Sequence, residues 1–384
     1  MVALSISVLI LLFLITAFGL SFSKIINVRF GKVETLLLGL VLVNASVTII
    51  SLFAPISIPI LVLFFVISLI CLFMCKAEFK TFLIFCKNDR MIVIYTIPFL
   101  IVAYIMCLGP PTIYDTGLYH LQNIKWIEQY PVVPGLANLH ARFGFNPNIF
   151  TLFALTSLKG IFSQEIFAVN FVIFVFLLLF IVKRLVAVVV NGSISTTFLF
   201  YFFILTALLR FDGLSSPAPD YIANCIALFL FIRVLDFSKQ HGPVDARQLL
   251  PLYILTLYVI TVKLSMIPLL LIPAIFFFYK FTETRKHLFV LGLVGSVIII
   301  PWLIRNVILT GWIVYPFASL DLFSFDWKIP TNSVIQMKEA ITGWARNPGP
   351  DSIVASKIAF KEWFPIWFYR IPLLHKSFFV ASFL

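Results

Sequence analysis

"MIVIYTIPFLIVAYIMCLGPPTIYDTGLYHLQNIKWIEQYP" (residues 91–131) combines an apolar run with an abrupt polar continuation. Its first 18 residues, 91–108, are long enough to cross the roughly 30 Å of hydrocarbon in a bilayer. The chain then turns at Pro110-Pro111 and offers Asp115 and His120 within a dozen positions. This stretch predicts a membrane-spanning helix that ends near Gly109 and is followed by a polar segment at the membrane surface.

The composition of the whole chain agrees with that prediction. The 384 residues are 61% apolar and 11% charged, whereas a soluble domain has about 25% charged residues. Apolar runs of similar length recur, and the alternating pattern of a membrane β-barrel is absent. The net charge of +12 comes from basic residues in short segments between the runs, which favours cytoplasmic loops over a nucleic-acid surface.

We therefore expect an all-α polytopic helical membrane protein with about ten to eleven transmembrane helices. Ten spans are expected near 3–20, 35–54, 57–74, 91–108, 164–182, 194–209, 219–235, 249–262, 265–279 and 288–304. Basic residues concentrate in alternate loops, which we assign to the cytoplasm by the positive-inside rule. The other loops, including two long ones, then fall on the outer face.

Five segments follow from this threading: N-terminal transmembrane helices (1–108), a first outer loop with surface helices (109–163), further transmembrane helices (164–304), a second long outer loop (305–376) and the start of another helix (377–384). The last segment is too short to cross, so we expect the protein to continue beyond it; the alternative is that its end lies at the membrane interface. In the outer loops, 118–130 has the spacing of an amphipathic surface helix, and "NPNIFTLFALTSL" (146–158) should dip partway into the membrane. Ser333 with Gln336 resembles a capping box.

Asp115 is the first candidate for chemistry. It lies about seven residues beyond a span, and the prolines before it stiffen the backbone. From that position it could accept a proton from an attacking hydroxyl group. The alternative is structural, because Asp is also a favoured N-cap of the helix that follows.

Three cations form the second candidate set. Arg210, Lys263 and Arg305 each close an outward-going span, so they should lie at similar depth and could bind a lipid phosphate. The alternative is that they extend their charged ends to the interface without binding anything specific. Asp220, on the same face, could pair with a cation, bind sugar hydroxyls or cap a helix.

The sequence gives little support for a metal-binding site. His120, His140 and Asp115 match no compact zinc spacing, and the five cysteines lie in or beside spans, where a small apolar role suits them. We predict no metal ligands, and a divalent cation stays an open alternative.

The stretch "PWLIRNVILTGWIVYP" (301–316) resembles the GT-C superfamily of polyprenyl-phosphate-sugar-dependent glycosyltransferases. Members similar to protein mannosyltransferases and the lipid A aminoarabinose transferase often show P-W-x-x-R-N, then a Gly and a Tyr-Pro. In these enzymes an acidic motif follows an early span and precedes a surface helix and a second short helix, which Asp115, 118–130 and "FNPNIFTLFAL" resemble. Many members have two adjacent acids, whereas Thr116 follows Asp115. "YDTGLYHLQNIKWIEQYPVVPGLANLH" also resembles an uncharacterised bacterial membrane-protein family linked to surface polysaccharides.

The resemblance implies a GT-C-like fold and transfer of a sugar from a polyprenyl-phosphate carrier to a surface-glycan, lipid or protein acceptor, with inversion. Asp115 would be the catalytic base. The residues expected to bind the lipid phosphate or the sugar are Arg305, Lys263, Arg210, Asp220, His120, Tyr119 and Asn306.

Other functions stay open from the sequence. A lipid-linked sugar transporter or flippase would also need interfacial cations, and a polysaccharide polymerase or ligase would use Arg and His in the outer loop 305–376. A non-catalytic scaffold in a surface-glycan complex is a third alternative. We expect an integral protein of the bacterial inner membrane with its site facing the periplasm, membrane lipids as partners and no nucleic acid.

Overall fold

The computed structural model describes residues 1–88, 90–163, 165–190, 196–209, 213–238, 249–279, 288–349, 352–373 and 376. These residues form helices and connecting segments, without a strand among them, which confirms the all-α prediction. The chain divides into two compact units. Unit 1 comprises Met1–Val132 and Asn146–Arg305, and unit 2 comprises Val133–Phe145 and Asn306–Leu384. The predicted first outer loop, 109–163, is thus divided between the two units.

Each of the ten predicted spans coincides with a helix. These are α1 (Val2–Ile25), α2 (Lys32–Ser51), α3 (Ile58–Met74), α5 (Arg90–Cys107), α9 (Val169–Val190), α10 (Thr196–Leu208), α11 (Pro219–Ser238), α12 (Leu250–Val262), α13 (Leu271–Tyr279) and α15 (Leu288–Thr310). Long apolar runs form helices because a helix satisfies its own backbone groups where no water can.

Only some of these helices have the length and composition of a span. In the described part of the chain, α1, α2, α5, α9 and α15 do, and a sixth span results if α3 and α4 (Lys76–Asn88), which meet at 85°, count as one. Such helices are compatible with an integral membrane protein. The predicted count of ten to eleven spans is not confirmed. Helices α10 and α12 have 13 residues each, which is about 20 Å.

Two glycines let α1 and α2 approach each other closely in unit 1. A Cβ atom on Gly39 would lie 1.8 Å from the Ile15 carbonyl oxygen, and one on Gly19 would lie 2.1 Å from the Thr35 carbonyl oxygen. No side chain fits at either position without moving a backbone. Small residues at such crossings are the usual means of close helix packing in membranes.

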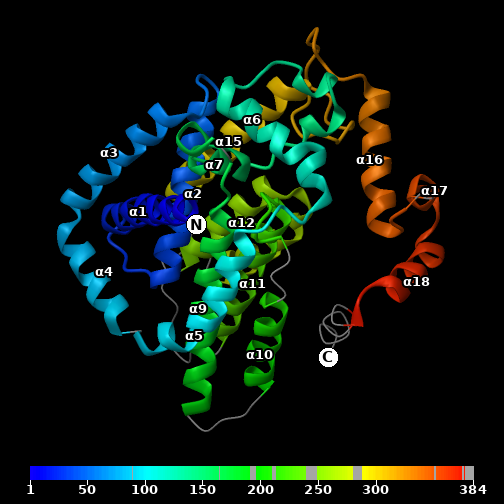
Figure 1. Cartoon of the computed structure of the whole chain (residues 1–384). Helices are drawn as coiled ribbons and strands as arrows, with labels where there is room; N and C mark the ends of the chain where they lie inside the picture. The colour runs from blue at the N-terminus through cyan, green and yellow to red at the C-terminus, as the bar shows by residue number, and fades with distance from the viewer. Residues whose placement is uncertain are drawn as a thin grey trace. The chain divides into compact units, whose positions relative to one another are not determined.

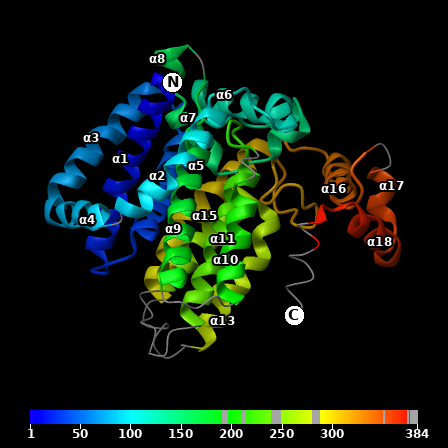
Figure 2. The ribbon, with the colours of Figure 1, turned by 60° about the horizontal axis from the view of Figure 1, so that its bottom comes forward.

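Helix α9 is the central element of a second group of helices in unit 1. It packs against α5, α10 and α11, and both views show these four helices side by side (Figures 1 and 2). Helix α12 packs on α11 and α2, and nearly all of its side chains are buried. Its apolar surface is therefore covered by protein.

The structure contains helices in both segments predicted after Asp115, with different bounds. The surface helix is α6 (Leu121–Gln129), preceded by a turn of π-helix, η1 (Thr116–His120). Ile124 and Ile127 are buried on one side of α6, as its amphipathic spacing predicts. The predicted dipping segment contains α7 (Ile149–Thr156), whose eight residues are all buried. Its neighbours include α2 and α6, so α7 is a core element of unit 1.

The described part of unit 2 has its own small core, the short 3-10 helices η2 (Leu136–Asn138) and η3 (Ala141–Gly144), and the helices α16 (Thr331–Arg346), α17 (Ser352–Lys357) and α18 (Phe360–Arg370). Trp312, Tyr315 and Val334 are central to the core. The predicted capping box is wrong: Pro330 occupies the N-cap position of α16 and no side chain caps it. Ser333 lies in the first turn, where its backbone N–H donates to the Pro330 carbonyl.

Candidate functional site

The chain before Asp115 is fixed by a loop that is distant in sequence. The Ser216 hydroxyl accepts hydrogen bonds from the backbone N–H groups of Thr112 and Ile113, at 2.9 and 3.1 Å. The Ser215 hydroxyl donates to the Pro110 carbonyl at 2.8 Å. These bonds hold the segment after α5 against the segment before α11, so the proline hinge predicted from sequence is also tied laterally.

Asp115 occupies the N-cap position of the π-helix η1, with φ −63° and ψ −18°, and its side chain makes no capping hydrogen bond. Its side chain is partly exposed. The capping role considered from sequence is therefore not what this carboxylate does. A single π turn within or beside an α-helix is uncommon and often found at functional sites.

The two aromatic residues that follow face inward. Tyr119 and His120 are 9% and 3% exposed, and their ring centroids lie 4.4 Å apart. The His120 ring also contacts Phe150 of α7, at 5.4 Å between centroids. Both side chains thus join η1 to the core of unit 1.

Lys263 and Asp220 are brought together. Lys263 follows the last residue of α12, and its Nζ lies 2.7 Å from Asp220 Oδ2, at the start of α11. The lysine side chain is 35% exposed and the aspartate side chain 66% exposed. The pair is accessible to solvent, so a ligand anion can compete for the ammonium group.

Arg305 lies inside unit 1 and not at its surface. Its side chain is 4% exposed. Its Nη1 donates to the Ser51 hydroxyl at 2.8 Å, and its Nε donates to Asn146 Oδ1 at 3.1 Å. Neither contact involves Asp115, and in the described chain no carboxylate forms an ion pair with this guanidinium. A charge held by neutral hydrogen-bond partners costs solvation energy.

Asn146 is itself held in place by the residue one helical turn before Arg305. The Trp302 Nε1–H donates to the Asn146 carbonyl at 2.8 Å, and Asn146 Nδ2 donates to the Trp302 carbonyl at 3.1 Å. Hydrogen bonds in both directions fix the orientation of the amide that receives the Arg305 Nε–H.

A buried polar network extends from this position towards the middle of α2. The Tyr258 hydroxyl donates to Asn44 Oδ1 at 2.6 Å, and Asn44 Nδ2 donates to Thr151 Oγ1 at 2.6 Å. Thr48 binds the Asn148 amide oxygen from the same helix face. All five side chains are 1% exposed or less. Sequence analysis missed this network, and the only available signal was isolated polar residues inside apolar runs.

Asn306, another predicted site residue, is not part of these contacts. Asn306 is buried in unit 2, where its Nδ2 donates to the Ile313 carbonyl at 3.1 Å and its carbonyl accepts from Thr310 Oγ1 at 2.7 Å. It closes the turn at the end of α15. Arg210 lies outside the described residues.

Together these contacts define a polar end of unit 1. The polar end consists of Asp115, the Lys263–Asp220 pair, Arg305 and its partners Ser51 and Asn146. The ends or starts of α2, α5, α11, α12 and α15 supply or hold these groups. The described residues include no group of three or more His, Cys, Asp or Glu side chains placed to hold a metal ion.

The opposite ends of the helices carry a separate ionic cluster. Arg233 lies 2.6 Å from Glu34 Oε1 and 3.1 Å from Asp236 Oδ2, and Asp236 also pairs with Arg184. The cluster joins α2, α9 and α11 near the first turn of α2 and the last turns of the other two. Its two positive and two negative groups balance, as buried or half-buried charges require.

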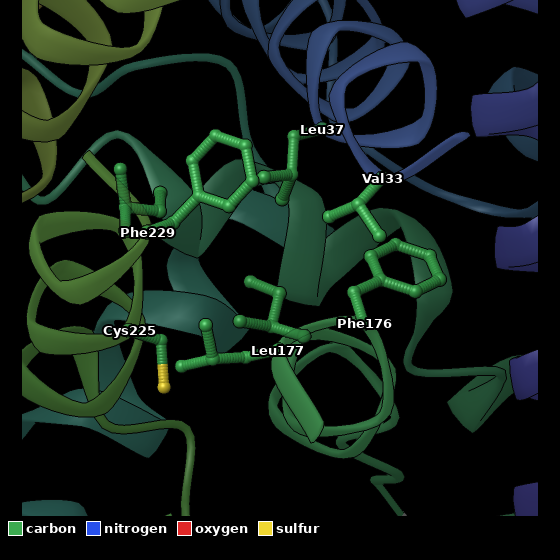
Figure 3. Close-up of a pocket in the computed structure, with 8 residues that line it drawn as sticks. Val33, Leu37, Phe176, Leu177, Cys225 and Phe229 are labelled. Atoms are coloured by element: carbon green, nitrogen blue, oxygen red, sulfur yellow. The ribbon is translucent and has the colours of Figure 1, made fainter. Parts of the chain in front are cut away.

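One small cavity lies among α2, α9 and α11 (Figure 3). Its lining is hydrocarbon except for the Cys225 thiol. Such a space offers no hydrogen-bonding group for a sugar or a phosphate.

With this geometry established, comparison with known proteins places the chain. Residues 1–384 match the model of a family described as "Domain of unknown function (DUF8201)". The chain belongs to this family. No curated protein and no solved structure matches it. The function of this DUF8201 protein is therefore argued from its residues.

Proposed function

We propose that this DUF8201 protein is a GT-C-type membrane glycosyltransferase. It would transfer a sugar from a polyprenyl-phosphate carrier to a surface-glycan, lipid or protein acceptor. The observation that carries the proposal is the polar end of unit 1, where an accessible carboxylate, an accessible cation and a buried cation occur at one end of a largely apolar helical unit. Catalytic groups of these types serve proton transfer and phosphate stabilisation.

Asp115 is the proposed general base. It would accept the proton of an acceptor hydroxyl while that oxygen forms a bond to the anomeric carbon of the donor sugar. The bond from this carbon to the phosphate oxygen breaks, and its electron pair leaves with the polyprenyl phosphate. Attack opposite the leaving group inverts the configuration. Support comes from the partial exposure of Asp115.

The leaving phosphate needs positive charge where its own negative charge develops. Sequence reasoning ranked Arg305 before Lys263 and Arg210. Exposure favours Lys263 for direct contact, because its side chain is 35% exposed and that of Arg305 only 4%. In the proposed site Lys263 contacts the phosphate, and Arg305 adds a fixed positive potential from within. Tyr119 and His120, which follow Asp115 in η1, complete the proposed set of sugar-binding groups, and Asp220 holds Lys263 until the phosphate displaces it.

We place the protein in the bacterial inner membrane with its polar end facing the periplasm. The loops with the most basic residues precede or follow the other ends of the helices, as the positive-inside rule predicts for the cytoplasm. Polyprenyl carriers and their acceptors are then available from the outer leaflet.

A lipid-linked sugar transporter is the second candidate, favoured by the ionic cluster of Glu34, Arg184, Arg233 and Asp236. Paired charges within spans are typical of transport pathways. We rank transport second because these groups lie near helix ends, where they also suit a structural tie between three helices.

The test uses the full chain reconstituted into vesicles with a panel of polyprenyl-phosphate-linked radioactive sugars. Release of the sugar to water or to added glycan acceptors measures transfer, and movement of intact donor between leaflets measures transport. We expect sugar release that Asp115→Asn abolishes. The matched control is Asp326→Asn, the same change at an exposed acid in unit 2, which should leave release unchanged. Wild-type release by Asp115→Asn rules out the base, and donor movement without release favours the transporter.

A further inference from the structure

Helix α18 has a composition that is unusual for a solvent-exposed helix. Six of its eleven residues are aromatic, and none of the eleven is buried. A surface helix of a soluble protein normally turns its large apolar side chains to a core. In the described chain, α18 has only partial cover from α16. Its partly exposed aromatic residues therefore present apolar surface outside the core of unit 2.

The aromatic rings of α18 form an ordered row. Phe360 stacks on Phe364 at 4.8 Å between centroids, and Phe364 stacks on Phe368 at 6.0 Å. Trp363 and Trp367 lie beside this row, 6.4 Å apart. The row follows the i to i+4 spacing of a helix, so the rings present a continuous surface along the helix axis.

Exposed apolar side chains continue from α18 onto the neighbouring helices. Trp344 of α16 is 61% exposed, Val354 of α17 is 63% exposed, and Leu373 after α18 is 79% exposed. We call these residues together with the α18 rings the α16–α18 surface. Large exposed apolar patches mark interaction sites.

The α16–α18 surface is held together by Arg346. Its Nη1 donates to the carbonyls of Ala355, Ser356 and Ile358 at 3.1, 2.9 and 3.2 Å. Its guanidinium lies 4.9 Å from the centre of the Trp363 ring. One side chain thus joins α16, α17 and α18, so the partly exposed rings belong to an organised surface.

The charge around the surface is positive. Between residues 331 and 376 the sequence has six Lys or Arg residues and three acidic ones, Glu339, Asp351 and Glu362. The basic residues are Lys338, Arg346, Lys357, Lys361, Arg370 and Lys376. Aromatic side chains among Lys and Arg are the composition of helices that lie in a membrane interface. Basic residues near an anionic leaflet are attracted to its surface.

We propose that the α16–α18 surface binds an anionic lipid bilayer, with α18 in the headgroup layer. Continuity of the chain favours this occupant, because the candidate span Phe289–Thr310 ends about twenty residues before α16. A second copy of the chain would bring like charges together. The inference does not depend on the proposed enzyme activity.

The first experiment measures the surroundings of Trp363 and Trp367 in the reconstituted full chain. Vesicles contain phosphatidylglycerol and lipids brominated near the headgroup, which quench tryptophan emission on contact. The double variant Trp363→Phe/Trp367→Phe keeps the aromatic surface but removes two tryptophans. If these tryptophans contact lipid, brominated lipid should quench much less emission in the double variant than in the wild-type protein. The control Trp312→Phe, at a 1% exposed core position, should lose little of it.

Acrylamide, a quencher in water, separates the alternatives. If the emission missing from the double variant is the part that only acrylamide quenches, α18 faces water, and the proposal is overturned. If the missing emission is the part that neither acrylamide nor brominated lipid quenches, other parts of the protein cover α18, and the proposal is again overturned.

A second experiment tests the charge. Lys357→Gln/Lys361→Gln should reduce the excess quenching in phosphatidylglycerol vesicles over pure phosphatidylcholine vesicles, and Glu362→Gln should increase it. Equal quenching of the wild-type protein in both kinds of vesicle overturns the assignment to anionic lipid.

Discussion

Lys263 Nζ lies 2.7 Å from Asp220 Oδ2, and this ion pair joins the end of α12 to the start of α11. Two-thirds of the aspartate side chain is exposed, so water and salt screen the attraction. An exposed pair contributes only about 0.2–1 kcal/mol. An anion that binds Lys263 more strongly can therefore displace the aspartate. In the proposed site, Asp220 and the phosphate would compete for Lys263.

The first prediction follows from that competition and rests on the proposed function. Asp220→Asn should tighten binding of polyprenyl phosphate by about twofold to fivefold, because the lysine no longer has an internal partner. Lys263→Gln should weaken binding. Equilibrium binding to the purified protein at low ionic strength measures both. Shifts in the same direction for the two variants would show that the pair has only a structural role.

The second prediction concerns the buried network of α2 and α12. Tyr258→Phe removes the hydrogen bond to Asn44 Oδ1 and should lower the free energy of unfolding by about 0.6–2 kcal/mol, the range for interhelical hydrogen bonds in membranes and for buried acceptors left without a donor. Unfolding in denaturing detergent measures it. Tyr253→Phe, on the same helix, is the matched control and should change little. Equal losses for the two variants would contradict a specific role of the hydroxyl.

The helices of this protein could be predicted from sequence far better than its buried contacts. Apolar runs specify helices locally, so each of the ten expected spans contains one. The number of helices that span the membrane depends on how short helices such as α10 and α12 pack. Hydropathy alone does not determine that packing.

The candidate site shows the same limit. The position of Arg305 at the end of an apolar run predicts an interfacial cation. Its burial depends on Ser51 and Asn146, which are more than 150 residues away in sequence. The π turn after Asp115 has no sequence signal that we could use. Residue types at the polar end were thus predictable, and their partners were not.

The third prediction tests the close approach of α1 and α2. Gly39→Ala places a Cβ atom 1.8 Å from the Ile15 carbonyl oxygen, so the helices must separate, at a cost of about 1–3 kcal/mol. The free energy of unfolding should fall by that amount. Gly292→Ala, in α15, is the control because no atom lies within 4 Å of its added Cβ. A loss of stability in Gly292→Ala as large as in Gly39→Ala would point to a general intolerance of the chain and not to this contact.

The fourth prediction concerns pH. Glu128 of α6 lies 3.7 Å from Lys159, and its side chain is 10% exposed. Burial and, to a smaller extent, the Glu165 carboxylate raise the pKa of Glu128 above 4.5, although the Ser157 hydroxyl and the Lys159 ammonium group act in the opposite direction. The folded state therefore binds this proton more strongly than the unfolded state, and stability falls as pH rises through the range above 4.5.

Glu128→Gln removes that dependence because the amide does not ionise. We expect the variant to have a higher Tm than the wild-type protein at neutral pH and the same Tm below pH 4.5, where both carry a neutral side chain. Thermal unfolding of the reconstituted protein across this range measures the difference. Glu165→Gln is the control, since Glu165 pairs with Lys159 at 3.2 Å and with Lys125 at 3.8 Å, and its loss should lower Tm at neutral pH. A lower Tm for Glu128→Gln at neutral pH would show that its attraction to Lys159 outweighs the cost of burial.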